Sequence, residues 1–166
     1  MALSTAARSN PVQHRSHPLR PLPDRPSRAV LDLGTLPTAP GCSRAWTRRI
    51  LLEWQLTGLL DSAELIVSEL VTNAMLASRP QGRPFIRLSL TLDQGELGIF
   101  VRDYCQGTPQ ATNVGDEDEN GRGLFLVEAM SSQFGWYPPE DGAPGKVVWA
   151  ALASCRLRGP AIALNA

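Results

Sequence analysis

Ser68-Glu69-Leu70-Val71-Thr72-Asn73-Ala74 is the stretch around which the chain is organised, because it places a carboxylate and a carboxamide in a largely apolar run. Glu69 and Asn73 are four residues apart, so on a helix they lie one above the other on the same face. Polar groups removed from water on such a face must be hydrogen-bonded or bound to a ligand. A carboxamide oxygen suits Mg²⁺, which usually binds through few protein oxygens together with substrate phosphates, and a carboxylate can accept a proton from a hydroxyl. Alternatively, the pair lies on the solvated edge of an amphipathic helix.

The composition limits the class of protein. The chain has 166 residues and zero formal net charge, which predicts one domain with some extra length and gives no indication of a nucleic-acid or membrane partner. No apolar run reaches the roughly 18 residues of a membrane span, and the start of the chain lacks a secretion signal, so we expect a cytoplasmic protein. Cys42, Cys105 and Cys155 form no CxxC pair, so neither a disulfide framework nor a zinc site is indicated.

The two ends of the chain differ in composition from its middle. Residues 1–28 are rich in proline and arginine and contain almost no large apolar side chain, which predicts a disordered tail. This tail is either an inert extension or a contact for an acidic partner. Residues 29–153 carry the periodic patterns of a folded domain, and residues 154–166 form a short C-terminal tail.

A short strand at residues 29–33 precedes the first expected helix, which runs from about residue 43 to residue 56. The large apolar side chains of this helix recur every four residues and share one stripe, which favours burial in the core: Trp46, Ile50 and Trp54. Gly58 is expected to end the helix.

The second expected helix carries Glu69 and Asn73 in its interior. It begins near Ser62, because residues 61–64 resemble a capping box, with an oxygen side chain followed by a carboxylate. It ends at Arg79, because the residue before a proline disfavours helical geometry.

The second half of the domain is predicted to contain strands on both sides of a polar loop. Alternating apolar residues at 86–92 and 97–101 predict an antiparallel hairpin with a turn at 93–95, and Asp103 lies where its second strand ends. A polar loop of about the length of residues 104–120 is often a lid or binding loop. After it, a glycine-rich helix start can bind phosphate oxygens through its backbone N–H groups. Two further strands are expected, at residues 134–137 and 146–152.

This order of elements predicts an α+β fold, a two-layer sandwich with helices on one face of a mixed, mostly antiparallel sheet. The sequence contains no GxxxxGK[ST] motif and no HRD-type loop, which excludes a P-loop protein and a conventional protein kinase. Both histidines, His14 and His17, lie in the N-terminal tail, so a histidine triad is also excluded.

Four short motifs occur in an order that resembles the GHKL (Bergerat-fold) ATPases, in particular the small bacterial anti-sigma-factor serine/threonine kinases of the actinobacterial type. SELVTNA at 68–74 is similar to the N box of that family and VRD at 101–103 to the start of its G1 box. GRGLFLV at 121–127 is similar to the G2 box, and GKVVWA at 145–150 to the closing strand. The resemblance covers roughly residues 40 to 153 and implies the Bergerat ATP-binding fold.

The resemblance also implies a role for each matching residue. Asn73 would ligate the Mg²⁺ that bridges the ATP phosphates, and Glu69 would be the catalytic general base for the attacking hydroxyl. Asp103 would accept a hydrogen bond from the adenine amine, unless it only caps the loop. The other ATP-binding residues would come from the glycine-containing segments: Gly107, Gly121, Arg122, Gly123 and Leu124. For Arg122, a solvent-exposed loop position is the alternative.

The implied function is that of an ATP-binding regulatory protein, with ATP and Mg²⁺ as cofactors, that transfers the γ-phosphoryl group to a Ser or Thr of an anti-sigma-factor antagonist. A homodimer is implied as well. Two departures from the family pattern favour an alternative: residues 75–78 lack the usual Arg-His pair, and Val147 replaces a threonine that supports the adenine-binding aspartate. Cys105 also replaces a glycine of the pattern, at a position where small relatives often vary.

That alternative is a non-catalytic module that sequesters a sigma factor or a similar partner, with weak or no nucleotide binding. A third interpretation, a histidine-kinase catalytic fragment, is disfavoured, because nothing upstream of the domain offers a phospho-acceptor helix.

Overall fold

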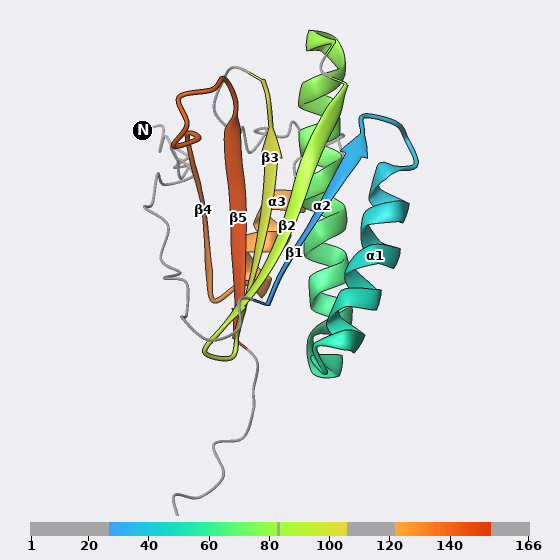
Figure 1. Cartoon of the computed structure of the whole chain (residues 1–166), viewed down its shortest axis with the longest axis vertical. Helices are drawn as coiled ribbons and strands as arrows, with labels where there is room; N and C mark the ends of the chain where they lie inside the picture. The colour runs from blue at the N-terminus through green and yellow to red at the C-terminus, as the bar shows by residue number, and fades with distance from the viewer. Residues whose placement is uncertain (1–26, 83, 106–121, 154–166) are drawn as a thin grey trace, which may run out of the picture.

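The computed structural model describes residues 27–82, 84–105 and 122–153 (Figure 1). In chain order these residues form β1 (Ser27–Gly34), α1 (Ala39–Glu53), α2 (Leu60–Ser78), β2 (Phe85–Asp93), β3 (Glu96–Asp103), α3 (Arg122–Met130), β4 (Gln133–Tyr137) and β5 (Lys146–Ala153). Short 3-10 turns flank α2 at Thr57–Leu59 and Arg79–Gln81. The expected C-terminal tail and nearly all of the expected N-terminal tail lie outside the described residues.

The strands form one sheet with the order β1-β2-β3-β5-β4. All four pairings between its described strands are antiparallel. The three helices lie on one face of this sheet, with α1 alongside α2 and α3 behind β3 and β5 in the view of Figure 1. The α+β two-layer fold expected from the sequence is therefore confirmed, and the sheet is antiparallel rather than mixed.

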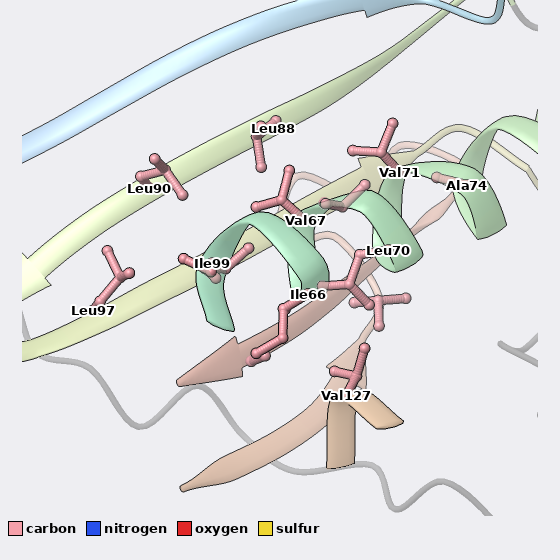
Figure 2. Packing of buried hydrophobic residues seen from close by; sticks show 14 of the residues in the cluster. Ile66, Val67, Leu70, Val71, Ala74, Leu88, Leu90, Leu97, Ile99 and Val127 are labelled. Atoms are coloured by element: carbon pink, nitrogen blue, oxygen red, sulfur yellow. The ribbon is translucent and has the colours of Figure 1, made fainter. Parts of the chain in front are cut away.

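One apolar core lies between the helices and the sheet (Figure 2). Alternate residues of each central strand point toward the helices, and residues three or four apart on α2 point back. The members labelled in Figure 2 are Ile66, Val67, Leu70, Val71 and Ala74 of α2, Leu88 and Leu90 of β2, Leu97 and Ile99 of β3, and Val127 of α3. Trp46 of α1 and Trp54, the residue directly after its end, pack against the same core, as the stripe in the sequence predicts.

Helix α2 begins earlier than the sequence suggests. Its N-cap residue is Leu59, which makes no side-chain capping hydrogen bond, and Asp61 lies inside the first turn. The capping-box prediction at residues 61–64 is therefore wrong, because the preceding 3-10 turn leads directly into the helix. None of the helices in the described part of the chain combines the length and the hydropathy needed to cross a bilayer.

The β2–β3 hairpin turns through Gln94 and Gly95, whose φ angles are 47° and 82°. Two consecutive positive φ angles are typical of a type I′ turn, which favours Asn-Gly because asparagine tolerates the left-handed conformation. We therefore expect Gln94→Asn to raise the free energy of unfolding by about 0.5 kcal/mol, measured by urea denaturation. Gln133→Asn in strand β4 is the control, and an equal gain in both variants would contradict this turn type.

Candidate functional site

Glu69 and Asn73 lie one turn apart on α2, where its buried face meets its surface, and both side chains are partly exposed. The Nδ2 atom of Asn73 is buried and has no hydrogen-bond partner among the residues that the structure describes. Rotation about χ2 exchanges the nitrogen and the oxygen of a carboxamide. One buried end of the Asn73 carboxamide is therefore available to a ligand, since a polar atom left unpaired in the interior is costly.

Gly123 brings the start of α3 against the Glu69 carboxylate. It is the second residue of α3 and is buried, and a Cβ atom added to it would overlap the Glu69 carboxylate oxygen. Only glycine allows this close approach. The first N–H groups of a helix have no partner within the helix and favour anions, so the fold places the Glu69 carboxylate next to a helix start that favours negative charge.

Asp103 forms a buried ion pair with Lys146. The two residues face each other at the ends of β3 and β5, with 2.8 Å between Oδ2 of Asp103 and Nζ of Lys146, and their side chains are only 1% and 8% exposed. The other carboxylate oxygen, Oδ1, accepts the backbone N–H of Cys105 at 3.1 Å. Gly145, at φ 125°, packs so closely on the Asp103 carbonyl that no Cβ atom fits there. Both oxygens of this carboxylate are thus bound within the protein.

Cys105 joins the end of β3 to the end of α2. Its thiol lies 3.4 Å from the hydroxyl of Ser78, the last residue of α2, and both residues are buried. A chain of polar contacts therefore runs from Ser78 through Cys105 and Asp103 to Lys146. Cys105, at the position where the resemblance implies a glycine, therefore contacts both the end of α2 and the Asp103 carboxylate.

The side chain beside Asp103 belongs to Lys146 and not to Val147. Val147 pairs with Arg102, and its side chain lies on the opposite face of the sheet, with Phe100 and Trp149. A threonine at position 147 could not support the Asp103 carboxylate, so that expectation is corrected. Only the register between β3 and β5 reveals the role of Lys146, which no motif in the sequence indicated.

The remaining predicted ATP-binding residues divide into three groups. Gly107 and Gly121 lie outside the described residues. Arg122 is the first residue of α3. Leu124 is buried in the apolar core, so a role in binding would fall to its backbone N–H group. Across residues 27–82, 84–105 and 122–153, no three His, Cys, Asp or Glu side chains gather as a metal site.

A family model for the histidine kinase-like ATPase domain matches residues 31–152. This range covers most of the chain, runs from within β1 to within β5, and includes every residue assigned above to the site. A comparison with curated protein sequences gave no match.

Proposed function

The chain belongs to the family of histidine kinase-like ATPase domains, and on this premise we propose that it is an ATP-binding regulatory protein that phosphorylates a Ser or Thr of an anti-sigma-factor antagonist. The observation that carries the proposal is the Asn73 carboxamide, whose buried end lacks a partner one turn from Glu69. As part of the same proposal, the protein acts in the cytoplasm as a homodimer, on the antagonist or on the sigma factor itself. It contacts neither nucleic acid nor membrane.

The residues present fit Mg²⁺ that arrives with the nucleotide. The amide oxygen of Asn73 would hold the ion, which usually takes few protein ligands and completes its shell with phosphate oxygens and water. When bound, Mg²⁺ neutralises charge on the phosphates. The N–H groups at the start of α3 would bind phosphate oxygens, and Asp103 would accept a hydrogen bond from the adenine amine.

Glu69 is the proposed general base, because the approach of Gly123 holds its carboxylate at the start of α3. It accepts the proton of the attacking Ser or Thr hydroxyl. The hydroxyl oxygen forms a bond to the γ-phosphorus, the bond from that phosphorus to the bridging oxygen breaks, and ADP leaves. Such a transfer depends mainly on positioning and charge neutralisation.

Calorimetric titration with ATP and Mg²⁺, together with single-turnover ADP release, tests this proposal. We expect Asn73→Ala to lower ATP affinity at least about tenfold, since it removes a contact to a charged group. Glu69→Gln should retain binding and lower turnover by about 10²–10⁴-fold, the usual contribution of a general base. Glu64→Gln on the same helix is the matched control and should change neither. Unchanged turnover in Glu69→Gln would refute the role of Glu69.

A second candidate is a non-catalytic module that binds a sigma factor or a similar partner. The Asp103–Lys146 ion pair favours it, because the carboxylate expected to bind adenine is already paired. The same titration distinguishes the two functions. No heat of binding at millimolar ATP would leave the partner-binding module as the function of the isolated protein.

A further inference from the structure

The Asp103–Lys146 ion pair does not exhaust the hydrogen-bonding capacity of either group. A carboxylate offers about four lone-pair sites, and Asp103 directs one oxygen at the backbone N–H of Cys105 and the other at the Lys146 ammonium. An ammonium carries three donors, and the ion pair itself uses one of them. The pair can therefore present an acceptor and a donor side by side to a ligand, with 2.8 Å between Oδ2 and Nζ.

The position of this pair continues the order of the candidate site along α2. Glu69 and Asn73 are four residues apart, and Ser78, the last residue of α2, follows five residues later. At about 1.5 Å per residue these steps measure about 6 and about 7.5 Å. The Cys105 thiol lies 3.4 Å from the Ser78 hydroxyl, and the Cys105 N–H binds Asp103. An extended ATP molecule carries its γ-phosphate, its Mg²⁺-bridged phosphates and its base in this same order, so the pair lies where the base belongs.

Both side chains of the pair project toward the helices. Asp103 follows Val101 in the alternation of β3, and Lys146 precedes Val148 in that of β5. The two valines pair with each other and belong to the core between the sheet and the helices. The ion pair therefore lies at the margin of the apolar core, where a hydrogen bond to a charged group is stronger than it is in water.

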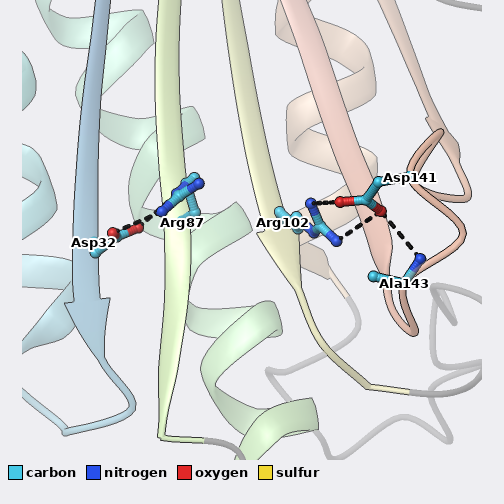
Figure 3. Close-up of polar contacts among 5 residues, drawn as sticks. All are labelled: Asp32, Arg87, Arg102, Asp141 and Ala143. Atoms are coloured by element: carbon cyan, nitrogen blue, oxygen red, sulfur yellow. Dashed lines mark hydrogen bonds and ion pairs between the residues drawn. The ribbon is translucent and has the colours of Figure 1, made fainter.

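The surrounding residues hold the two strand ends in a fixed relation. Arg102, whose side chain points to the opposite face of the sheet, is bound by both carboxylate oxygens of Asp141, at 3.0 and 3.1 Å (Figure 3). Asp141 lies in the connection between β4 and β5, and Gly145, at the end of this connection, packs on the Asp103 carbonyl without room for a Cβ atom. Lys146 thus starts β5 in a position that β3 determines, which makes the pair a preorganised binding group.

We propose that Lys146 is a specificity-determining residue for the nucleotide base, an inference that rests on the proposed ATP-dependent function. Its ammonium donates a hydrogen bond to N1 of adenine, while the Asp103 carboxylate accepts one from the exocyclic amine beside N1. Adenine presents this donor and this acceptor on one edge. Guanine presents the reverse, with O6 in place of the amine and an N–H in place of N1. Both charged groups would then lack a partner on the bound base, which disfavours guanine.

Calorimetric titration of the full chain with Mg²⁺ and four nucleotides tests this assignment: ATP, 1-deaza-ATP, 7-deaza-ATP and GTP. 1-Deaza-ATP keeps the amine but has a C–H group in place of N1. We expect its affinity to lie about ten- to a hundredfold below that of ATP, the effect of losing a hydrogen bond to a charged group. 7-Deaza-ATP is altered on the other edge of the base, so it is the matched control and should bind like ATP. GTP should bind at least about a hundredfold more weakly than ATP.

A double variant assigns the effect to the ion pair. Asp103→Asn with Lys146→Met removes both charges of the pair and leaves neither unpaired in the interior, and it should bind ATP and 1-deaza-ATP equally well. Asp32→Asn with Arg87→Met removes the exposed ion pair on the other face of the sheet (Figure 3) and should keep the wild-type ratio of the two affinities. Urea denaturation reports whether both variants are folded.

The outcomes separate this inference from the proposed function. If ATP itself does not bind at millimolar concentration, the ATP-dependent function fails and the role of Lys146 fails with it. If ATP binds and 1-deaza-ATP binds equally well, only the role of Lys146 is refuted. An equal loss of affinity with 7-deaza-ATP, GTP binding as tight as that of ATP, or an unchanged ratio in the Asp103–Lys146 double variant would refute this role as well. The wild-type affinities need no substitution, so they decide the question even if the double variant does not fold.

Discussion

Lys146→Met should lower the free energy of unfolding by about 3–5 kcal/mol, because it leaves the buried Asp103 carboxylate without its positive partner. The matched control is Arg87→Met, which breaks the Asp32–Arg87 pair on the exposed sheet face. That pair has a similar separation of 2.7 Å, but water screens it, so its removal should cost at most about 1 kcal/mol. Urea denaturation of both variants measures the contrast. If Lys146→Met lowered the free energy of unfolding by no more than Arg87→Met, this result would contradict a stabilising role for the buried Asp103–Lys146 pair.

A double variant separates the charge from the hydrogen bond. Asp103→Asn keeps an oxygen that can accept the Cys105 N–H but removes the negative charge. Combined with Lys146→Met it should recover most of the stability lost in Lys146→Met alone, because no unpaired charge remains in the interior. Asp103→Ala would remove both interactions at once, so lost ATP binding in that variant would not distinguish a missing contact from a destabilised fold.

The strands and the core were largely predictable from the sequence, because apolar residues recur at every second position of β2 and β3 and β5 is an almost continuous apolar run. The end of α1 was not predictable from the sequence. Gly58 was expected to close it, yet the helix ends at Glu53 and Gln55 takes a φ of 57°. The N–H of Leu56 bonds the carbonyl of Leu51, and both leucines are buried. The burial of both leucines and this backbone hydrogen bond offset the cost of a glutamine in the left-handed conformation.

The site was predictable only where a single element defines it. The four-residue spacing of Glu69 and Asn73 requires nothing beyond a helix, and α2 supplies it. The approach of Gly123 to Glu69 joins α3 to α2, and the pairing of Lys146 with Asp103 depends on strand register. A shift of one residue in the register between β3 and β5 would place the Lys146 side chain on the other face of the sheet. No local sequence pattern could therefore have identified the Asp103–Lys146 pair.

Gly123→Ala should lower ATP turnover by about 10²-fold, because its methyl group occupies the space of the Glu69 carboxylate and displaces the proposed base. The fold should tolerate the change. The atom that must move is the end of a flexible side chain, and alanine favours a helix over glycine by about 1 kcal/mol. ATP affinity should therefore change little, which calorimetry and urea denaturation would confirm.

A double-mutant cycle decides whether Gly123 acts through Glu69. If it does, adding Gly123→Ala to Glu69→Gln should cost almost nothing more in turnover, because the base is already lost. Additive losses would mean that the methyl group harms phosphate binding at the start of α3 directly. Gly58→Ala is the control, since a Cβ atom there meets nothing within 4 Å, and it should leave turnover unchanged. The close approach of α3 to α2 would then be what holds the base in position for transfer.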